Sequence, residues 1–240
     1  KDTITYAHTR GLRVSGHIPV FLRAEDAVNA GYDEIQHINQ VLLNFLVTPT
    51  TDTRTLERFV LPAEKVGDLD FNSKPVLDFI ALLKEKNVAI DPTVVTFEFL
   101  RQRDGTVPEG YAEVMEHWPI DLQRSFRIGG MKISDDAAAE RYKKSYGKML
   151  EFVGIMYKAG IPIVAGTDAI SGFTLHSELE FYVKHSGMTP VQALQIATRN
   201  GALYSRVSHD RGSITPGKLA DLVLVDGDPT TNIADIRRIA

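Results

Sequence analysis

Ile161-Pro162-Ile163-Val164-Ala165-Gly166-Thr167-Asp168-Ala169 is the stretch around which the chain is organised. Its apolar part is too short for a helix and is flanked by Gly160 and Gly166, as expected of a buried parallel strand. Asp168 follows at the carboxyl end of that strand, where (β/α) enzymes keep their catalytic groups. An aspartate at this position is equally consistent with a helix cap or a turn, and the strand pattern alone does not separate the two interpretations.

Three more short strands are predicted upstream. Residues 12–17 and 33–38 each end at or near a histidine, and residues 88–93 form a third strand that Pro92 ends. Between and after the strands, helices are predicted at 24–30, 74–87, 140–159 and 174–186. Strand–helix alternation implies a parallel sheet, and four strands are half of a closed barrel. The predicted fold class is therefore α/β, a partial (β/α)8 TIM barrel.

Two regions depart from this alternation. Residues 100–139 are rich in Gly and Pro and are predicted to be an insertion that covers an active-site mouth. From residue 211 onward the hydrophobic period changes, and residues 220–228 are predicted to form a β-hairpin. We therefore expect two units, a barrel portion at 1–210 and part of a small β-structure at 211–240.

Composition excludes several classes of protein. The 240 residues are 43% hydrophobic and 24% charged, which is typical of a soluble globular protein. A net charge of −4 with scattered Lys and Arg gives no sign of nucleic-acid binding. No apolar run approaches the ~20 residues of a membrane span. Without cysteine, any metal must be held by His, Asp or Glu. The cellular compartment stays open.

Three predicted strand ends carry His17, His37 and Asp168. The carboxyl ends of parallel strands meet at one face, so these side chains can converge there. Two imidazoles and a carboxylate suit Zn²⁺ or a similar divalent ion, which lowers the pKa of a coordinated water to ~7. A single strand-end histidine is more often a hydrogen-bonded structural residue. Two of them followed by Gly-Thr-Asp favour a site.

The same stretches resemble a known superfamily. Residues 7–17 (AHTRGLRVSGH), 30–37 (AGYDEIQH) and 165–168 (AGTD) are similar to barrel strands five, six and eight of the amidohydrolases. Residues 190–202 resemble the helix after strand eight, and residues 212–225 resemble the return into the small β-sandwich of that superfamily. The resemblance is strongest to the group of imidazolonepropionase-like and prolidase-like enzymes.

The resemblance implies roles for particular residues. His17 and His37 would be metal ligands, and Asp168 would touch a metal and act as general base. His176 would face the substrate, a small molecule or a dipeptide-like compound, although a surface position at a helix start is equally consistent with its sequence context. The remaining histidines are expected to be structural or exposed: His8, His117, His185 and His209. Glu98 could line the mouth of the site, although a carboxylate in a loop is more often solvated.

The chain also departs from the superfamily pattern. No His-x-His pair exists in the sequence, and the bridging lysine of strand four would have to precede Lys1. The resemblance therefore implies that a binuclear site is expected only in a longer protein, of which these residues would be an internal or C-terminal part. Exposed sheet edges would then favour self-association.

Three functions follow from these observations. The first is a metal-dependent hydrolase of amide, peptide or cyclic amide C–N bonds. The second is a non-catalytic fragment without the strand-one histidine pair, which would associate with itself or with a missing half. The third is a deaminase of the same superfamily, which is disfavoured because Val20 occupies the position where those enzymes usually carry a glutamate.

Overall fold

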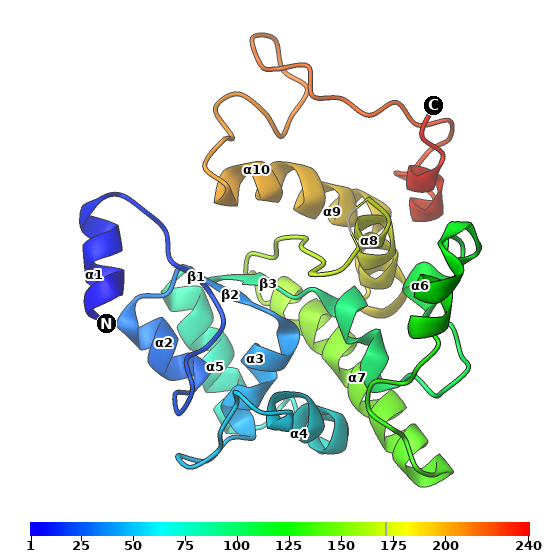
Figure 1. The fold of residues 1–240 in the computed structure, drawn as a ribbon. Helices are drawn as coiled ribbons and strands as arrows, with labels where there is room; N and C mark the ends of the chain where they lie inside the picture. Colours follow the sequence, from blue (N-terminus) through cyan, green and yellow to red (C-terminus); the bar gives the residue numbers. More distant parts are fainter. Residues whose placement is uncertain (171) are drawn as a thin grey trace.

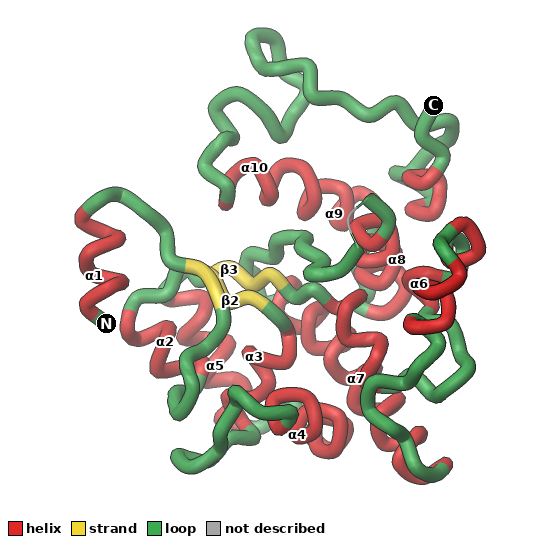
Figure 2. Tube along the Cα trace, viewed as in Figure 1, coloured by secondary structure: helices red, strands yellow, loops and turns green. Residues whose placement is uncertain are grey.

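A short parallel sheet lies at the centre of the structure. The computed structural model describes residues 1–170 and 172–240 (Figure 1). Strands β1 (Ser15–Gly16), β2 (Glu34–Gln36) and β3 (Ala89–Asp91) pair in that order, and Ile163 extends the sheet through a parallel bridge to Ile90. Three of the four predicted strands are therefore present, in consecutive order and parallel, although each is shorter than expected (Figure 2). The fourth is reduced to the bridge at Ile163.

Amphipathic helices cover the sheet. Helix α1 (Asp2–Thr9) precedes β1, α2 (Ala24–Ala30) joins β1 to β2, and α5 (Lys74–Glu85) leads into β3. The long helix α7 (Asp136–Lys158) precedes the fourth strand and begins at Asp135, whose carboxylate accepts the N–H of Ala138 at 2.8 Å. Helices α5 and α7 turn their apolar faces inward and supply much of the core, including Val76, Phe79, Leu83, Met149, Phe152 and Val153.

The remaining connections are built from short helices. Between β2 and α5 lie α3 (Ile38–Leu42), η1 (Leu43–Phe45), α4 (Glu57–Lys65) and η2 (Val66–Asp68). After β3 the chain forms η3 (Val94–Leu100) and then the predicted insertion, which contains η4 (Glu109–Tyr111), η5 (Met115–His117) and α6 (Ile120–Ser125). Within the insertion, η4 packs against both η3 and α8.

The helices after the fourth strand follow the predicted signals. Helix α8 (Thr174–His185) is succeeded by α9 (Pro190–Gln195), the π-helical turn η6 (Ile196–Asn200) and α10 (Gly201–Tyr204). Thr189 caps α9 as its sequence predicts, and Gln192 completes the capping box. In the part of the chain that the structure describes, no helix is both long and apolar enough to cross a bilayer.

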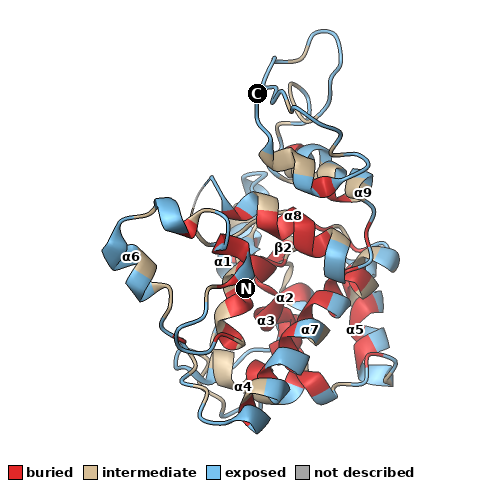
Figure 3. Cartoon of the chain, turned by 90° about the vertical axis from the view of Figure 1, so that its right-hand side faces the viewer, coloured by how far each residue is buried: buried red, intermediate tan, exposed pale blue. Residues whose placement is uncertain are grey.

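The predicted hairpin at residues 220–228 is wrong. Val225 instead makes a single antiparallel bridge to Ile239, and Val223 and Leu224 are 69% and 74% exposed. A lone pair of strands is marginally stable in water, and within residues 1–170 and 172–240 these side chains are left largely open to solvent. In this region η7 (Ile233–Arg237) packs against α8 and buries Ile233. Most of the chain near the C-terminus is drawn as exposed or intermediate (Figure 3). The boundary at 210/211 stays a prediction.

Candidate active site

The structure brings the three strand-end residues to one place. His37 Nε2 lies 3.8 Å from Asp168 Oδ2, and the ring centroids of His17 and His37 are 4.6 Å apart. All three side chains border one small cavity of about 90 Å³, which we call the histidine cavity. Arg58 borders the same cavity. Parallel strands thus present these groups at a shared edge, as their sequence positions indicate.

The backbone at these strand ends is unusual. His37, Thr93 and Asp168 have φ angles of 72°, 48° and 45°, a region that residues other than glycine rarely adopt. Such conformations cost on the order of 1–3 kcal/mol each and persist only where the surroundings hold them. Three of them at the ends of neighbouring strands show that this edge of the sheet is held by its packing and hydrogen bonds.

His37 is buried and oriented. Its Nδ1 lies 2.7 Å from the hydroxyl of Thr93, so that Nε2 is the nitrogen that faces Asp168. Burial, with a further contribution from His17, lowers the pKa of His37 to about 4. The imidazole is therefore neutral at physiological pH, which is the form that binds metals.

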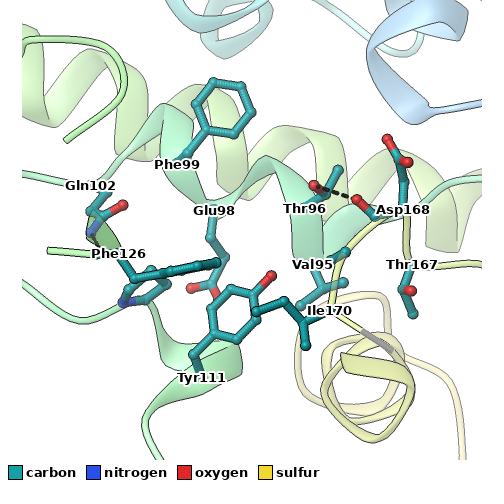
Figure 4. Close-up of a pocket in the computed structure, with 12 residues that line it drawn as sticks. Val95, Thr96, Glu98, Phe99, Gln102, Tyr111, Phe126, Thr167, Asp168 and Ile170 are labelled. Atoms are coloured by element: carbon teal, nitrogen blue, oxygen red, sulfur yellow. Dashed lines mark hydrogen bonds between the residues drawn. The ribbon is translucent and has the colours of Figure 1, made fainter. Parts of the chain in front are cut away.

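Two threonines tie the segment after β3 to the site. Thr93 contacts His37, and the hydroxyl of Thr96 donates to the backbone carbonyl of Asp168 at 3.1 Å (Figure 4). These contacts join residues that are 56 and 72 positions apart in the chain. The segment 93–96 therefore contacts both His37 and Asp168 directly.

Glu178 on α8 holds that segment. Its carboxylate is fully buried and accepts the N–H groups of Val94 and Val95 at 2.9 and 2.7 Å. The hydroxyl of Tyr146 on α7 donates to the carbonyl of Val94 at 3.0 Å. Burial raises the pKa of Glu178 to about 8, against the opposing effect of its hydrogen bonds from Val95, Val94 and Tyr182. Two helices distant in sequence thus fix the backbone beneath the site.

Asp91 performs a similar function for the fourth strand. Its Oδ1 accepts the N–H of Gly166 at 2.8 Å, two residues before Asp168. A methyl group at Gly166 would overlap the Asp91 carboxylate, so only glycine allows this approach. Burial and the nearby charge of Glu34 raise the pKa of Asp91 to about 7.

His176 is not brought to this place. It is half-buried at the start of α8, where burial and the guanidinium of Arg237 lower its pKa. It borders neither cavity that Asp168 borders. Its predicted contact with the substrate stays untested. Among the other histidines, His8 bonds Asp33 at 2.9 Å, and His117 is 76% exposed.

A larger cavity of about 730 Å³ lies on the other side of Asp168 (Figure 4). We call it the aromatic cavity, because Phe99, Tyr111 and Phe126 border it. Glu98 also borders it and is only 2% exposed, so the expectation of a solvated carboxylate is wrong. The physical reason is that Glu98 accepts hydrogen bonds from Arg101 and from the N–H groups of Glu109 and Gly110, at 2.7, 3.0 and 2.6 Å.

The strand-end residues fit a divalent metal by donor type. Two imidazoles and a carboxylate are the ligands that Zn²⁺ takes, and the Thr93 contact orients His37 as ligating histidines are usually oriented. Within residues 1–170 and 172–240, however, no three His, Cys, Asp or Glu side chains are already arranged to hold an ion. Binding of an ion there would require the exposed side chains of His17 and Asp168 to rearrange.

Sequence reasoning missed several contributors to the site. Thr93 follows Asp91 and Pro92 at the end of a predicted strand, and that position was the signal that could have identified it. Glu178 offered no such signal, because it is an ordinary charged residue in an amphipathic helix 84 positions from its partner. Arg58 likewise offered no signal, because it lies on α4 in a region where the sequence predicts a loop at residues 48–53 and short helical patterns around it.

Curated relatives match limited parts of the chain. An adenine deaminase of Rubrobacter xylanophilus is 47% identical over 62 residues, which is 25% of this chain and 10% of the relative. An imidazolonepropionase of Flavobacterium johnsoniae is 40% identical over 73 residues, or 29% of this chain and 18% of the relative. An ochratoxinase of Aspergillus niger is 35% identical over 77 residues, or 32% and 16%.

Solved structures resemble the whole chain. A Xaa-Pro dipeptidase with bound methionine in its active site superposes with a TM-score of 0.58 at 21% identity, covering 98% of this chain and 44% of that one. The A. niger ochratoxinase gives a TM-score of 0.58 at 20% identity, covering 99% and 41%. The chain therefore spans less than half the length of these structures, and the likeness shows a shared fold. Residues 4–239 match the amidohydrolase family, and the chain belongs to that family.

Proposed function

We propose that this chain carries the catalytic residues of a hydrolase that cleaves amide, peptide or cyclic amide C–N bonds. The observation that carries the proposal is the convergence of His17, His37 and Asp168 at one cavity. Membership of the amidohydrolase family supports it, as do the names of the relatives, which include a deaminase, an imidazolonepropionase and a dipeptidase. The substrate would be a small molecule or dipeptide-like.

Asp168 is the proposed general base. Its side chain is 67% exposed and borders both cavities, so it can reach a water molecule and a substrate together. It would accept the proton of the attacking water and deliver it to the leaving nitrogen. The hydrogen bond from Thr96 to its backbone carbonyl holds the backbone of Asp168 at this edge of the sheet.

His17, His37 and Asp168 are the proposed ligands of a divalent metal, with zinc the best match to their donor atoms. When bound, such an ion makes water acidic enough to ionise near neutral pH. His37 is suited to its role because it is already neutral and oriented. A binuclear site would need ligands beyond those that the described residues bring to the cavity.

The finer architecture belongs to the same proposal. We assign the parallel strands to positions five to eight of a (β/α)8 barrel at residues 1–210, and residues 211–240 to part of a β-sandwich. The parallel order of the strands supports the first assignment. Exposed apolar residues such as Val223 and Leu224 support the second, because they need a facing layer. The same surfaces support self-association, and His176 is retained as a candidate substrate contact.

Asp168→Asn tests the proposal in the intact, zinc-supplemented protein. The carboxamide keeps the shape of the side chain but does not accept the proton. For an amide that the wild-type protein cleaves, the rate of hydrolysis should therefore fall by about 10²–10⁴-fold. Asp78→Asn is the matched control, because Asp78 is 61% exposed on α5, where it pairs with Lys74. Wild-type turnover by Asp168→Asn would rule out the role given to Asp168.

Two alternatives give different results. The non-catalytic interpretation is not favoured by a family match that runs through residues 4–239, and it predicts no metal content and no turnover. The similarity to adenine deaminase keeps the deaminase open, although Val20 lacks the proton-transferring group expected there. Ammonia release from adenine at a rate exceeding amide hydrolysis would select the deaminase.

A further inference from the structure

The aromatic cavity is part of the proposed site yet has no assigned ligand. At about 730 Å³ it falls within the range of pockets that enclose a small organic molecule. It is bordered by Thr167, Asp168 and Ala169, so it opens directly at the proposed general base. A group bound there would lie on one side of the bond under attack.

The walls of this cavity are contributed by separate parts of the chain. Tyr111 and Phe126 come from the insertion, and their rings pack edge to face with centroids 4.9 Å apart. Val95 and Phe99 come from η3, and Ile170 follows the fourth strand. Figure 4 shows Tyr111, Phe126 and Ile170 directed toward the same space. Such surfaces gain free energy from contact with flat apolar groups.

The charges around the cavity disfavour an ionic ligand. Among the described residues that border it, none is Lys, Arg or His, and only Glu98 and Asp168 carry a carboxylate. Glu98 is already paired with Arg101 and with two backbone N–H groups. An anionic substrate group would therefore lose its hydration without gaining a partner, and a cationic group could pair only with Asp168, which is already assigned to the metal and to proton transfer.

The histidine cavity differs in charge, because Arg58 and two histidines border it beside its phenylalanines. Thr96, Phe99 and Asp168 border both cavities and so form the wall between them. Arg58 borders only the histidine cavity. A substrate that spans this wall would place its polar or anionic end toward Arg58 and its apolar end in the aromatic cavity.

We propose that the aromatic cavity is a specificity site for a bulky, uncharged, aromatic group next to the scissile C–N bond. The position of the bond rests on the proposed function. The class of group that the cavity binds rests on its walls, its volume and its charges alone. Phe126 is the specificity-determining residue of this site.

Four probes on one scaffold test the inference with the intact protein: the N-acetyl amides of phenylalanine, alanine, lysine and glutamate. Calorimetry measures their binding, and release of ammonia or amine measures their turnover. The phenylalanine probe should bind about tenfold or more tighter than the alanine probe, as burial of a phenyl ring implies. The lysine and glutamate probes should bind no tighter than alanine.

Phe126→Ala should remove most of the preference for phenylalanine over alanine. Tyr6→Ala is the control, because Tyr6 is 61% exposed on α1 and borders neither cavity. Thermal melting establishes that each variant is folded. If Phe126→Ala does not fold, Phe126→Leu is used instead; it keeps apolar volume and should lower the preference by a smaller factor. The binding of the four probes to the wild-type protein tests the inference without any variant.

The outcomes separate the two proposals. Equal binding of all four probes, tighter binding of a charged probe, or an unchanged preference in folded Phe126→Ala would overturn the specificity site. A clear preference for phenylalanine without turnover of any amide would support the specificity site and count against the hydrolase. Turnover of the amides without a preference for phenylalanine would support the hydrolase and count against the specificity site.

Discussion

Replacement of Glu178 by glutamine should cost stability in a way that depends on pH. Glu178 is fully buried and accepts two backbone N–H groups, from Val94 and Val95. Glutamine offers one carbonyl oxygen and an amide group that cannot accept, so one buried N–H loses its partner. A buried donor without a partner costs about 1–3 kcal/mol in the free energy of unfolding.

The pH dependence has a definite sign. The pKa of Glu178 is about 8 in the folded protein and near the ordinary value of 4.5 when unfolded, so the native state holds an extra proton between these values. Wild-type stability therefore falls as pH rises through this window, by about 1.4 kcal/mol for each pH unit. Glutamine does not titrate. The cost of Glu178→Gln should thus be largest at about pH 5, and it should vanish or reverse in sign by about pH 8.

Urea unfolding of both proteins at the two pH values measures this difference. His37 and Asp91 also titrate, with pKa values of about 4 and about 7, and they act in opposite directions. His37 makes the free energy of unfolding rise with pH between about pH 4 and 6.5. Asp91 makes the free energy of unfolding fall with pH between about pH 3.8 and 7. Both groups remain in the variant, so their effects largely cancel in the comparison.

Glu85→Gln is the matched control, since Glu85 is 68% exposed at the end of α5. Its cost should be within about 0.5 kcal/mol of zero at both pH values. A cost of Glu178→Gln that is independent of pH, or that grows as pH rises, would refute the reasoning about the buried carboxyl group.

Three further predictions concern the same edge of the sheet. Thr93→Val removes the hydroxyl that contacts His37 Nδ1 but keeps the branched shape, so zinc affinity measured by competition with a chromophoric chelator should fall about 10–100-fold. An unchanged affinity would show that Thr93 does not orient the imidazole. Gly166→Ala places a methyl group against the Asp91 carboxylate and should lower stability by about 1–3 kcal/mol in chemical denaturation, whereas Gly147→Ala, where the space is open, should not destabilise. Tyr146→Phe leaves the carbonyl of Val94 without its donor and should cost about 0.5–1.5 kcal/mol, and a wild-type midpoint in urea would contradict that assignment.

The elements of this chain are well specified by local patterns. Helix α2 begins and ends at the predicted residues, and α8 differs from its prediction by one residue. Periodic apolar positions and caps act over one or two turns, so they can be identified without knowledge of the fold. The strands were placed correctly but predicted too long, because strand length depends on pairing with neighbours that the local sequence does not specify.

The hairpin at 220–228 fails for a related reason. Its apolar run between polar turn residues is typical of a strand, but a strand exists only where a partner supplies hydrogen bonds and a facing layer. Within the described part of the chain, Val225 finds Ile239 as its only such partner and the other apolar side chains stay exposed. A local pattern therefore predicted the tendency to form a strand but not the pairing.

At the stretch 161–169, the sequence by itself determined a short buried strand that delivers Asp168, and two further strands that deliver His17 and His37. Their common edge followed because parallel strands end on the same side of a sheet. Only the tertiary structure decided what holds them: Thr93 against His37, Thr96 against Asp168, and Glu178 beneath both. These contacts join residues 56 to 84 positions apart, and such pairs form because the packing of the whole domain brings them together, so no local pattern encodes them.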